Sequence, residues 1–318
     1  MPITLPPLTR RRFIASSLST AGSALLGQRL LATSPDEDTA AIDPDRIALL
    51  ADTHIDGDPK RFVYGTKWPG SPVKEDEHEG VNMADCLDRV VRDILAMDPL
   101  PAHAIVNGDC ARTSGTEKEY EEFLRLIKPL RDAGITVHVT IGNHDNRKQL
   151  WQAVPDLKTV ESGRHVGVLQ LPKAEVILLD SERGTMGADQ LSWLREQLSD
   201  GERRYVPMLV FVHYNPYPRS EVRPMKGLNG TEGEALLGLL EEQRRAKALF
   251  FGHTHDWAVE ERMGVHMINQ LPVSYYFGKG QPHGWLDMQL TDTDASLQVR
   301  CVDPKHHQHG KSHALRWR

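Results

Sequence analysis

The sequence predicts an α/β fold, and three observations carry this prediction. Short, nearly continuous apolar runs alternate with segments in which apolar residues recur at helical spacing. Many of the runs are rich in β-branched residues, as in strands that are buried on both faces of a sheet. Polar residues or glycine follow several of the runs directly, at the carboxyl ends of strands where α/β sheets keep their ligand crevices.

The composition is that of an ordinary globular protein, with 318 residues, 39% hydrophobic and 26% charged. The formal net charge of -6 argues against nucleic-acid binding through a broad basic face. No apolar run is long enough to form a stable transmembrane helix. The three cysteines lack C-x-x-C spacing and are too few for a disulfide scaffold. The 15 histidines are therefore the informative feature, because imidazole binds metals and carries protons.

The first 34 residues contain no Asp or Glu and carry Thr9-Arg10-Arg11-Arg12 ahead of a modest apolar, Ser- and Ala-rich stretch. This order resembles a twin-arginine export signal. It predicts that residues 1–34 direct the protein through the twin-arginine export machinery to a periplasmic or extracellular location. An organelle transit peptide and a disordered basic tail are the alternatives. Residues 35–45, which contain prolines and several acidic residues, are interpreted as a linker.

The folded part begins with a predicted strand at residues 47–51, which ends in Asp52-Thr53-His54. The polar segment 56–79 is long for a loop within a compact domain, and such loops are often lids or substrate-facing walls. A second strand at residues 102–106 runs into Asn107-Gly108-Asp109. Between them lies an amphipathic helix, with an apolar stripe of Leu87, Val90, Val91, Ile94 and Leu95.

Two helices are predicted to begin with a capping box, in which a Thr and a Glu three residues later satisfy free backbone N–H groups. The first pair is Thr116 and Glu119, and the second is Thr231 and Glu234. Another helix is expected after Gly187, with Leu191, Leu194 and Leu198 on one face.

The strand at residues 135–141 leads into Gly142-Asn143-His144-Asp145. A hairpin-like pair follows at residues 165–171 and 176–179, and no internal repeat or second domain is indicated. Two further buried strands, at residues 208–212 and 248–251, precede His213 and Gly252-His253-Thr254-His255. Antiparallel edge strands are expected at residues 265–268, 285–290 and 297–302.

Metal-competent side chains thus follow five of the predicted strands. They are Asp52 and His54; Asp109; Asn143 with His144; His213; and His253 with His255. Each piece alone is more often a turn or a hydrogen-bonded rim residue than a ligand. Chance does not readily supply all five in this order with an apolar strand before each, so the conjunction indicates one shared site.

The residue types suit a pair of metal ions about 3.5 to 4 Å apart, which needs one bridging carboxylate and terminal ligands on each side. Asp109 is the natural bridge, because it stands between the other strands in sequence and is the isolated carboxylate of the set. Imidazoles with mixed oxygen ligands favour iron, manganese or zinc over magnesium or calcium. The predicted cofactors are therefore two divalent or trivalent transition-metal ions.

Residues 46–256 resemble the calcineurin-like metallophosphoesterases, and among them the class III cyclic-nucleotide phosphodiesterases. The family pattern D-x-H, G-D, G-N-H-(D/E), H and G-H-x-H stands complete in this chain. The resemblance implies a four-layer α/β-β/α sandwich, with two mixed sheets flanked by helices. It also implies that one metal takes Asp52, His54, Asp109 and His255, and the other takes Asp109, Asn143, His213 and His253.

The same resemblance implies that His144 points at the substrate instead of a metal and serves the leaving group, while a metal-bridging hydroxide attacks phosphorus. Asp145 is predicted to hold the tautomer of His144, with a turn or cap role as the alternative. Arg112 and Arg147 are candidate phosphate ligands, or else solvated loop charges. Tyr214 replaces a His that often follows this ligand strand in the family, and it either stacks on a base or packs.

The predicted domain covers residues 46–303, followed by a His-rich polar tail at residues 304–318. The predicted function is an exported, metal-dependent phosphoesterase that acts on a small phosphodiester or phosphomonoester. The alternatives are a nucleotide or lipid-linked pyrophosphate hydrolase and a non-catalytic metal-binding scaffold. The sequence does not indicate an oligomeric state.

Overall fold

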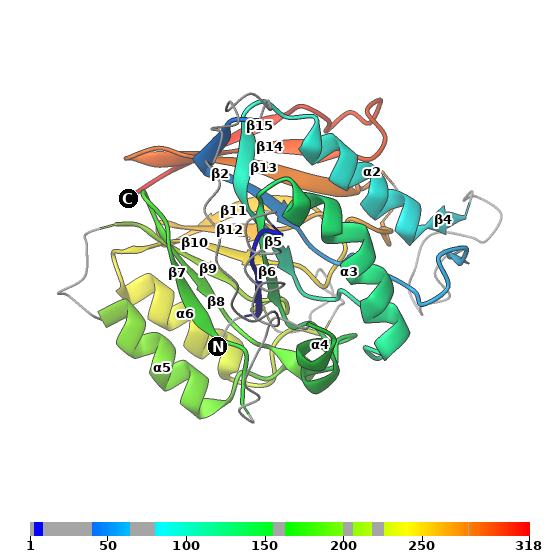
Figure 1. The fold of residues 1–318 in the computed structure, drawn as a ribbon. Coiled ribbons are helices and arrows are strands. Elements are labelled where there is room, and N and C mark those ends of the chain that lie inside the picture. Colours follow the sequence, from blue (N-terminus) through cyan, green and yellow to red (C-terminus); the bar gives the residue numbers. More distant parts are fainter. Residues whose placement is uncertain are drawn as a thin grey trace, which may run out of the picture.

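Two large β-sheets pack face to face, and helices cover the outer face of each (Figure 1). The structure is a computed structural model, and it describes residues 3–8, 40–63, 80–154, 163–199, 206–217, 226–278 and 280–318. The predicted four-layer α/β-β/α sandwich is confirmed by the three hydrophobic cores that separate the layers.

The first sheet has seven strands, and its central strands β6, β5 and β2 run parallel. The other neighbouring strands in this sheet pair antiparallel. In spatial order the strands are β1 (Ile3–Leu5), β6 (Thr136–Thr140), β5 (Leu100–Asn107), β2 (Ile42–Leu50), β13 (Gly284–Leu290), β14 (Asp294–Cys301) and β15 (Ser312–Arg316).

The second sheet has six strands, and β12, β10, β9 and β8 run parallel in its centre. In spatial order its strands are β11 (Ala258–Arg262), β12 (Val265–Asn269), β10 (Ala246–Phe251), β9 (Met208–Phe211), β8 (Glu175–Leu178) and β7 (Gly167–Gln170). A small ribbon of β3 (Phe62–Val63) and β4 (Val81–Asn82) lies apart from both sheets.

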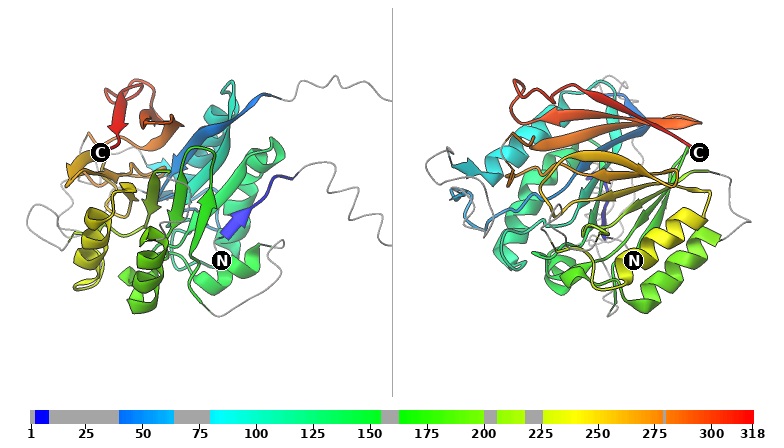
Figure 2. Two further views of the ribbon diagram at one scale, coloured as in Figure 1. Left: turned by 90° about the vertical axis from the view of Figure 1, so that its left-hand side faces the viewer. Right: turned by 180° about the vertical axis from the view of Figure 1, so that it is seen from behind.

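Helices α2 (Met83–Leu95) and α3 (Glu117–Asp132) pack together over the first sheet, next to the short α4 (Arg147–Ala153). Helices α5 (Gly187–Ser199) and α6 (Glu232–Glu242) pack over the second sheet, and the 3-10 turn η3 (Glu182–Gly184) precedes α5. Figure 2 shows the two helical layers on opposite sides of the sheets. No helix among the described residues is both long and apolar enough to cross a membrane.

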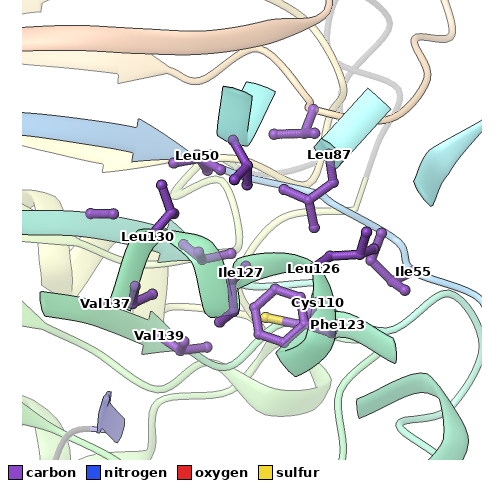
Figure 3. Close-up of a cluster of buried hydrophobic side chains, with 14 of the residues drawn as sticks. Leu50, Ile55, Leu87, Cys110, Phe123, Leu126, Ile127, Leu130, Val137 and Val139 are labelled. Atoms are coloured by element: carbon purple, nitrogen blue, oxygen red, sulfur yellow. The ribbon is translucent and has the colours of Figure 1, made fainter. Parts of the chain in front are cut away.

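The central strands are continuously apolar because they face a core on each side. In β2, Ala48 and Leu50 pack toward the helices, whereas Ile47 and Leu49 pack between the two sheets. Figure 3 shows the helix-facing core, in which the apolar stripe of α3 covers β6. The labelled contributors include Phe123, Ile127, Leu130, Val137 and Val139. Burial of this kind holds the ends of the central strands in fixed positions.

The two predicted capping boxes have different outcomes. At α3 the box is formed, because Thr116 Oγ1 accepts from Glu119 N–H and the Glu119 carboxylate accepts from Thr116 N–H. At α6 the predicted box is wrong, since Thr231 has helical backbone angles and its side chain caps nothing. The neighbouring Glu232 instead accepts from the N–H groups of Met186 and Gly187, and so joins α6 to the start of α5.

Three expectations about the edges of the sheets are corrected. Strands β12, β13 and β14 are interior strands, not edge strands. Each has an antiparallel neighbour, as predicted, but β12 also runs parallel to β10. The end of the predicted polar tail is strand β15, which pairs with β14 and buries Leu315 between the sheets. The last residues of the predicted linker already belong to β2.

Strand β1 was not predicted at all, because three residues give no periodic signal. Ile3 and Leu5 are fully buried beside β6, and Thr4 Oγ1 lies 3.0 Å from His138 Nδ1. These residues fall within the segment interpreted as an export signal. The arginine motif of that segment and most of the predicted 56–79 lid lie outside the described residues.

Candidate metal centre

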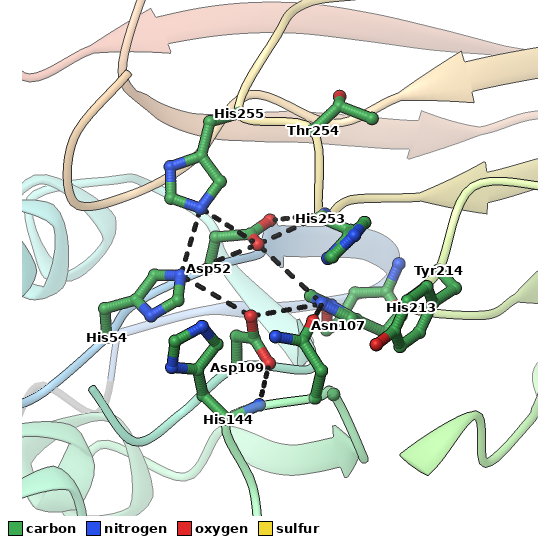
Figure 4. A network of polar contacts seen from close by, with 12 residues as sticks. Asp52, His54, Asn107, Asp109, His144, His213, Tyr214, His253, Thr254 and His255 are labelled. Atoms are coloured by element: carbon green, nitrogen blue, oxygen red, sulfur yellow. Dashed lines mark hydrogen bonds and ion pairs between the residues drawn. The ribbon is translucent and has the colours of Figure 1, made fainter. Parts of the chain in front are cut away.

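The predicted metal-binding residues come together at one edge of the two sheets. Asp52 and His54 follow β2, Asp109 follows β5, and Asn143 with His144 follows β6 in the first sheet. His213 follows β9, and His253 with His255 follows β10 in the second sheet. Because all five strands run parallel within their sheets, their carboxyl ends meet at the same edge. Figure 4 shows these carboxylates and imidazoles grouped around a common centre.

Backbone hydrogen bonds continue past the ends of the strands and fix the loops against one another. Asp52 N–H donates to the Gly108 carbonyl, and His54 N–H donates to the Asp109 carbonyl at 2.9 Å. On the other sheet, Gly252 N–H donates to the His213 carbonyl at 2.9 Å. These main-chain hydrogen bonds therefore fix the backbone positions of the residues that carry the functional side chains.

Five of the side chains stand on residues with left-handed backbone, which L-amino acids seldom adopt. The φ angles are 52° at Asp52, 47° at His54, 50° at Asp109, 69° at His253 and 54° at His255. Each such residue costs about 1–3 kcal/mol, so this strain is concentrated where ligand direction matters most.

Three glycines allow the loops to approach the ligands closely. A Cβ on Gly142 would overlap the Asp109 carboxylate. A Cβ on Gly252 would lie 2.5 Å from Asp52 Oδ2, and one on Gly108 would lie 2.5 Å from His213 Nδ1. The glycine in each of these motifs therefore has a steric role that is specific to the adjacent ligand.

The first group of ligand atoms consists of Asp52, His54 and His255. The Nε2 atoms of His54 and His255 lie 3.0 Å apart, and His255 Nε2 lies 3.4 Å from Asp52 Oδ1. All three side chains are almost completely buried. Ligands that bind one cation at about 2.0–2.2 Å are separated by distances of this size.

The second group consists of Asp109, His213 and His253. His213 Nε2 lies 3.2 Å from Asp109 Oδ2 and 3.3 Å from the amide oxygen of Asn143. The same Asp109 oxygen lies 3.5 Å from His54 Nε2. Asp109 therefore reaches both groups, which is the position that a bridging carboxylate needs.

Backbone carbonyl oxygens orient two of the imidazoles through their Nδ1 atoms. His213 Nδ1 lies 2.9 Å from the Asn107 carbonyl oxygen, and His255 Nδ1 contacts the Tyr275 carbonyl oxygen. Since Nδ1–H donates in each case, Nε2 is the nitrogen that remains to bind a metal. Asn107 is itself held by a hydrogen bond from its side-chain amide to Gln270 at 2.7 Å.

The buried carboxylates of the centre attract positive charge, as the pKa values of the neighbouring groups show. Burial alone would raise the pKa of Asp109, but His213 and His54 outweigh this effect and hold it well below its ordinary value. Burial alone would lower the pKa of His213, but Asp109 and Asp52 raise it to about 10. Burial lowers the pKa of His54 to about 3 and that of His253 to about 4. His54 and His253 are therefore neutral beside ionised carboxylates, which is the state that metal ligands require, whereas His213 would release its proton when a metal binds.

The donor set therefore fits two transition-metal ions. Asp52, His54 and His255 would hold one ion, and His213, His253 and Asn143 would hold the other, with Asp109 shared. Among the described residues, the buried atom His54 Nδ1 has no hydrogen-bond partner, so the polar contacts of this ring are made by Nε2.

His144 lies beside both groups and is only partly buried. Its ring meets that of His54 edge-on at 4.7 Å, and its backbone N–H donates to Asp109 Oδ1 at 2.8 Å. Its Nδ1 lies 2.6 Å from the Arg112 carbonyl oxygen. His144, His54 and Asp109 also form a group within metal-binding distance, so the free Nε2 of His144 is close enough to act on a molecule held at the centre.

The predicted role of Asp145 is wrong. Its carboxylate accepts from the backbone N–H groups of Cys110, Ala111 and Gly142 and from the Tyr120 hydroxyl, and it makes no hydrogen bond to His144. Burial, followed by the nearby charge of Asp109, raises the pKa of Asp145 to about 6 although these donors oppose the shift. Asp145 therefore joins the loop after β5 to the loop after β6 through these hydrogen bonds.

The two candidate arginines are both occupied. Arg147 forms a bidentate ion pair with Asp180 at 2.7 and 2.9 Å and also contacts Glu182, so the phosphate-binding prediction is contradicted for this residue. Arg112 pairs with Asp56 Oδ2 at 2.9 Å, and its side chain is 27% exposed. It lies at the rim of the centre with one carboxylate partner.

Aromatic side chains surround the ligands, and the sequence indicated only one of them. Tyr214 is buried, and its ring lies 4.3 Å from His253, which favours the packing interpretation. Tyr275 and Phe277 lie against His255 at 4.7 and 4.5 Å. Both belong to an irregular segment after β12, where neither periodicity nor a ligand motif gives a signal.

A sandwich whose strand ends bring a shared carboxylate and several imidazoles together has the layout of a dinuclear metallohydrolase. The family model described as calcineurin-like phosphoesterase matches residues 45–257, and the chain belongs to that family. The match contains all the candidate metal ligands, from Asp52 to His255.

Individual relatives share about 30% sequence identity with this chain. A probable cyclic nucleotide phosphodiesterase of Fibrobacter succinogenes is 31% identical over 48% of this chain and 56% of its own length. A probable glycerophosphodiester phosphodiesterase of Arcobacter nitrofigilis is 29% identical over 55% of this chain and 64% of its own length. The chain thus spans between half and two thirds of the length of these two relatives.

Solved structures support the fold. A dimetal phosphatase from Danio rerio superimposes with a TM-score of 0.60 at 14% identity, over 87% of this chain and 100% of that structure. A purple acid phosphatase from yellow lupin gives a TM-score of 0.58 at 11% identity, over 86% of this chain and 53% of that structure. At these identities the likeness concerns the architecture alone.

Proposed function

We propose that this protein is an exported, metal-dependent phosphoesterase that hydrolyses a small phosphodiester or phosphomonoester. The position of Asp109 carries the proposal, because its Oδ2 atom lies 3.5 Å from His54 Nε2 and 3.2 Å from His213 Nε2. A carboxylate shared between two groups of imidazoles serves two metal ions. Two such ions, when bound, supply Lewis-acid charge and lower the pKa of a water molecule.

The residues of the chain then have distinct roles. Asp52, His54, His255, His213, His253, Asn143 and Asp109 bind the ions. His144 Nε2 hydrogen bonds to the phosphoryl group or its leaving oxygen, and the Arg112 carbonyl holds the imidazole in place through Nδ1. The hydrogen bond stabilises charge that develops as the ester bond breaks.

A phosphodiester is favoured over a pyrophosphate. A second phosphate needs additional cationic side chains, but Arg147 is bound to Asp180 and Arg112 to Asp56. The relatives from Fibrobacter and Arcobacter carry the names of phosphodiesterases, which agrees with this preference.

Hydrolysis of model substrates tests the proposal. After reconstitution with manganese, the protein is expected to hydrolyse bis(p-nitrophenyl) phosphate, and p-nitrophenyl phosphate serves as the monoester comparison. Faster hydrolysis of a nucleoside diphosphate sugar than of either model substrate would favour the pyrophosphatase alternative. Absence of turnover on all three with metals bound would support the non-catalytic scaffold and reject the proposal.

The export proposal depends on Arg10 and Arg11, the arginine pair that follows Thr9 in the N-terminal segment. Fractionation of a bacterial host that expresses the full chain is expected to place the protein outside the cytoplasm. Replacement of both arginines by lysine is expected to retain it inside. Equal distribution of the two proteins would reject export by this route.

A further inference from the structure

The segment that follows β12 is anchored directly to the first metal-ligand loop. Val273 N–H donates to the Ala51 carbonyl at 2.9 Å. Ser274 is fully buried, and its N–H and hydroxyl both lie close to the Asp52 carbonyl oxygen, at 3.3 and 2.7 Å. The next residue, Tyr275, is therefore held in a fixed position beside Asp52.

Tyr275 contacts the first ligand group through both its backbone and its ring. Its carbonyl oxygen accepts from His255 Nδ1. Its ring centre lies 4.7 Å from that of His255 and 5.3 Å from that of His54. Phe277 stacks on His255 at 4.5 Å and packs near Tyr275 as well. The aromatic ring has a clear packing role, but this role does not require a hydroxyl group.

The Tyr275 hydroxyl has no hydrogen-bond partner within the part of the chain that the structure describes. The ring that carries this hydroxyl lies against two imidazoles of the first ligand group, those of His255 and His54. Tyr275 is only partly buried, so the residue keeps some exposure to solvent. A tyrosine hydroxyl beside a reaction centre with no protein partner is a free donor at neutral pH.

We propose that Tyr275 is a substrate-positioning residue whose hydroxyl donates a hydrogen bond to a non-bridging phosphoryl oxygen of a phosphodiester. The inference rests on the proposed function and narrows it. A diester carries one negative charge and suits a neutral donor, whereas the dianion of a monoester would gain more from a free cation. The rings of His144 and Tyr275 both lie against that of His54, at 4.7 and 5.3 Å, so the two side chains together would hold the phosphoryl group beside this ligand.

The variant Tyr275→Phe tests this assignment, because it keeps the ring and removes only the hydroxyl. Its kcat/KM for bis(p-nitrophenyl) phosphate is expected to fall about 10- to 100-fold, the effect of one lost hydrogen bond to a charged group. Manganese content should stay unchanged. Affinity for dimethyl phosphate, a diester that is inert enough for calorimetry, should weaken by a similar factor in the manganese-loaded protein.

The matched control is Tyr276→Phe, since the ring of Tyr276 lies 5.8 Å from His283 instead of a metal-ligand imidazole. This variant should retain wild-type activity and dimethyl phosphate affinity. Unchanged diester hydrolysis and unchanged dimethyl phosphate affinity in Tyr275→Phe would overturn the inference, and so would a loss of manganese. If the wild type hydrolyses no ester, the proposed function fails, and the calorimetric comparison still decides the role of Tyr275.

Discussion

The Nδ1 atom of His144 lies 2.6 Å from the carbonyl oxygen of Arg112, and this contact sets the direction of the imidazole. A backbone carbonyl oxygen can only accept a hydrogen bond, so Nδ1 carries the proton and Nε2 accepts when the ring is neutral. When the ring is protonated, Nε2 can donate to the oxygen of a leaving group. The loop after β5 therefore supplies both the shared carboxylate and the anchor of the neighbouring histidine.

Replacement of His144 by Ala should remove most turnover and keep the metals. Positioned acid or base catalysis usually contributes about 10²- to 10⁴-fold, so kcat should fall by a factor in this range. Metal analysis of the purified variant should give the wild-type content, since other residues hold the ions. A variant that loses its metals would show that His144 is a ligand, and one with full activity would show that it has no catalytic role.

Replacement of Asp145 by Asn should reduce stability and leave the pH profile of catalysis unchanged. The new amide group would face at least one of the backbone donors of Gly142, Cys110 and Ala111, at a cost of about 1–3 kcal/mol. Thermal unfolding and the pH dependence of kcat measure the two effects. A displaced kcat profile with an unchanged unfolding temperature would mean that Asp145 acts through His144 after all.

Replacement of Arg147 by Ala should destabilise the fold without weakening substrate binding. The change leaves the fully buried carboxylate of Asp180 without its bidentate partner, which costs up to about 3 kcal/mol. Denaturant titration should show this loss, while KM for the diester should stay within about twofold of the wild type. A large rise in KM at unchanged stability would restore the phosphate-binding role.

The stability of the first sheet should depend on pH through His138. Burial, assisted by His103, lowers the pKa of His138 from its ordinary 6.5 to about 3. The folded state therefore favours the neutral ring, and this contribution is complete above pH 6.5 and is lost as the pH falls from 6.5 toward 3. The variant His138→Gln should remove up to about 1.4 kcal/mol per pH unit from the acid slope of the unfolding free energy. Identical slopes in both proteins would contradict this account.

The α/β class and the positions of the ligands at strand ends were predictable because both depend on local signals, whereas the four-layer arrangement was implied by the family resemblance. The apolar run at residues 47–51 predicts a buried strand before its neighbouring strands are known. Asp52 and His54 come directly after this run in the sequence, so they lie at the end of the strand. Parallel pairing then brings these ends together. The edges were harder, since β1 and β15 are short strands whose stability comes from the strands beside them.

The side-chain partners could not be predicted for a related reason. Asp145 is adjacent to His144 in sequence, yet it bonds to Tyr120 and to the loop after β5. Arg147 follows a ligand motif, yet Asp180 from the other sheet binds it. The Asp145 contacts depend on how α3 and the loop after β5 pack against the loop after β6. The Arg147 pair depends on how the two sheets pack, and so does the place of Tyr275 beside Asp52.

A manganese titration of the metal-free protein, followed by hydrolysis of bis(p-nitrophenyl) phosphate, tests the central claim most directly. The shared position of Asp109 predicts that two manganese ions bind per chain and that activity appears as the second ion binds. Saturation at one ion with full activity, or binding of two ions without any hydrolysis, would contradict the account.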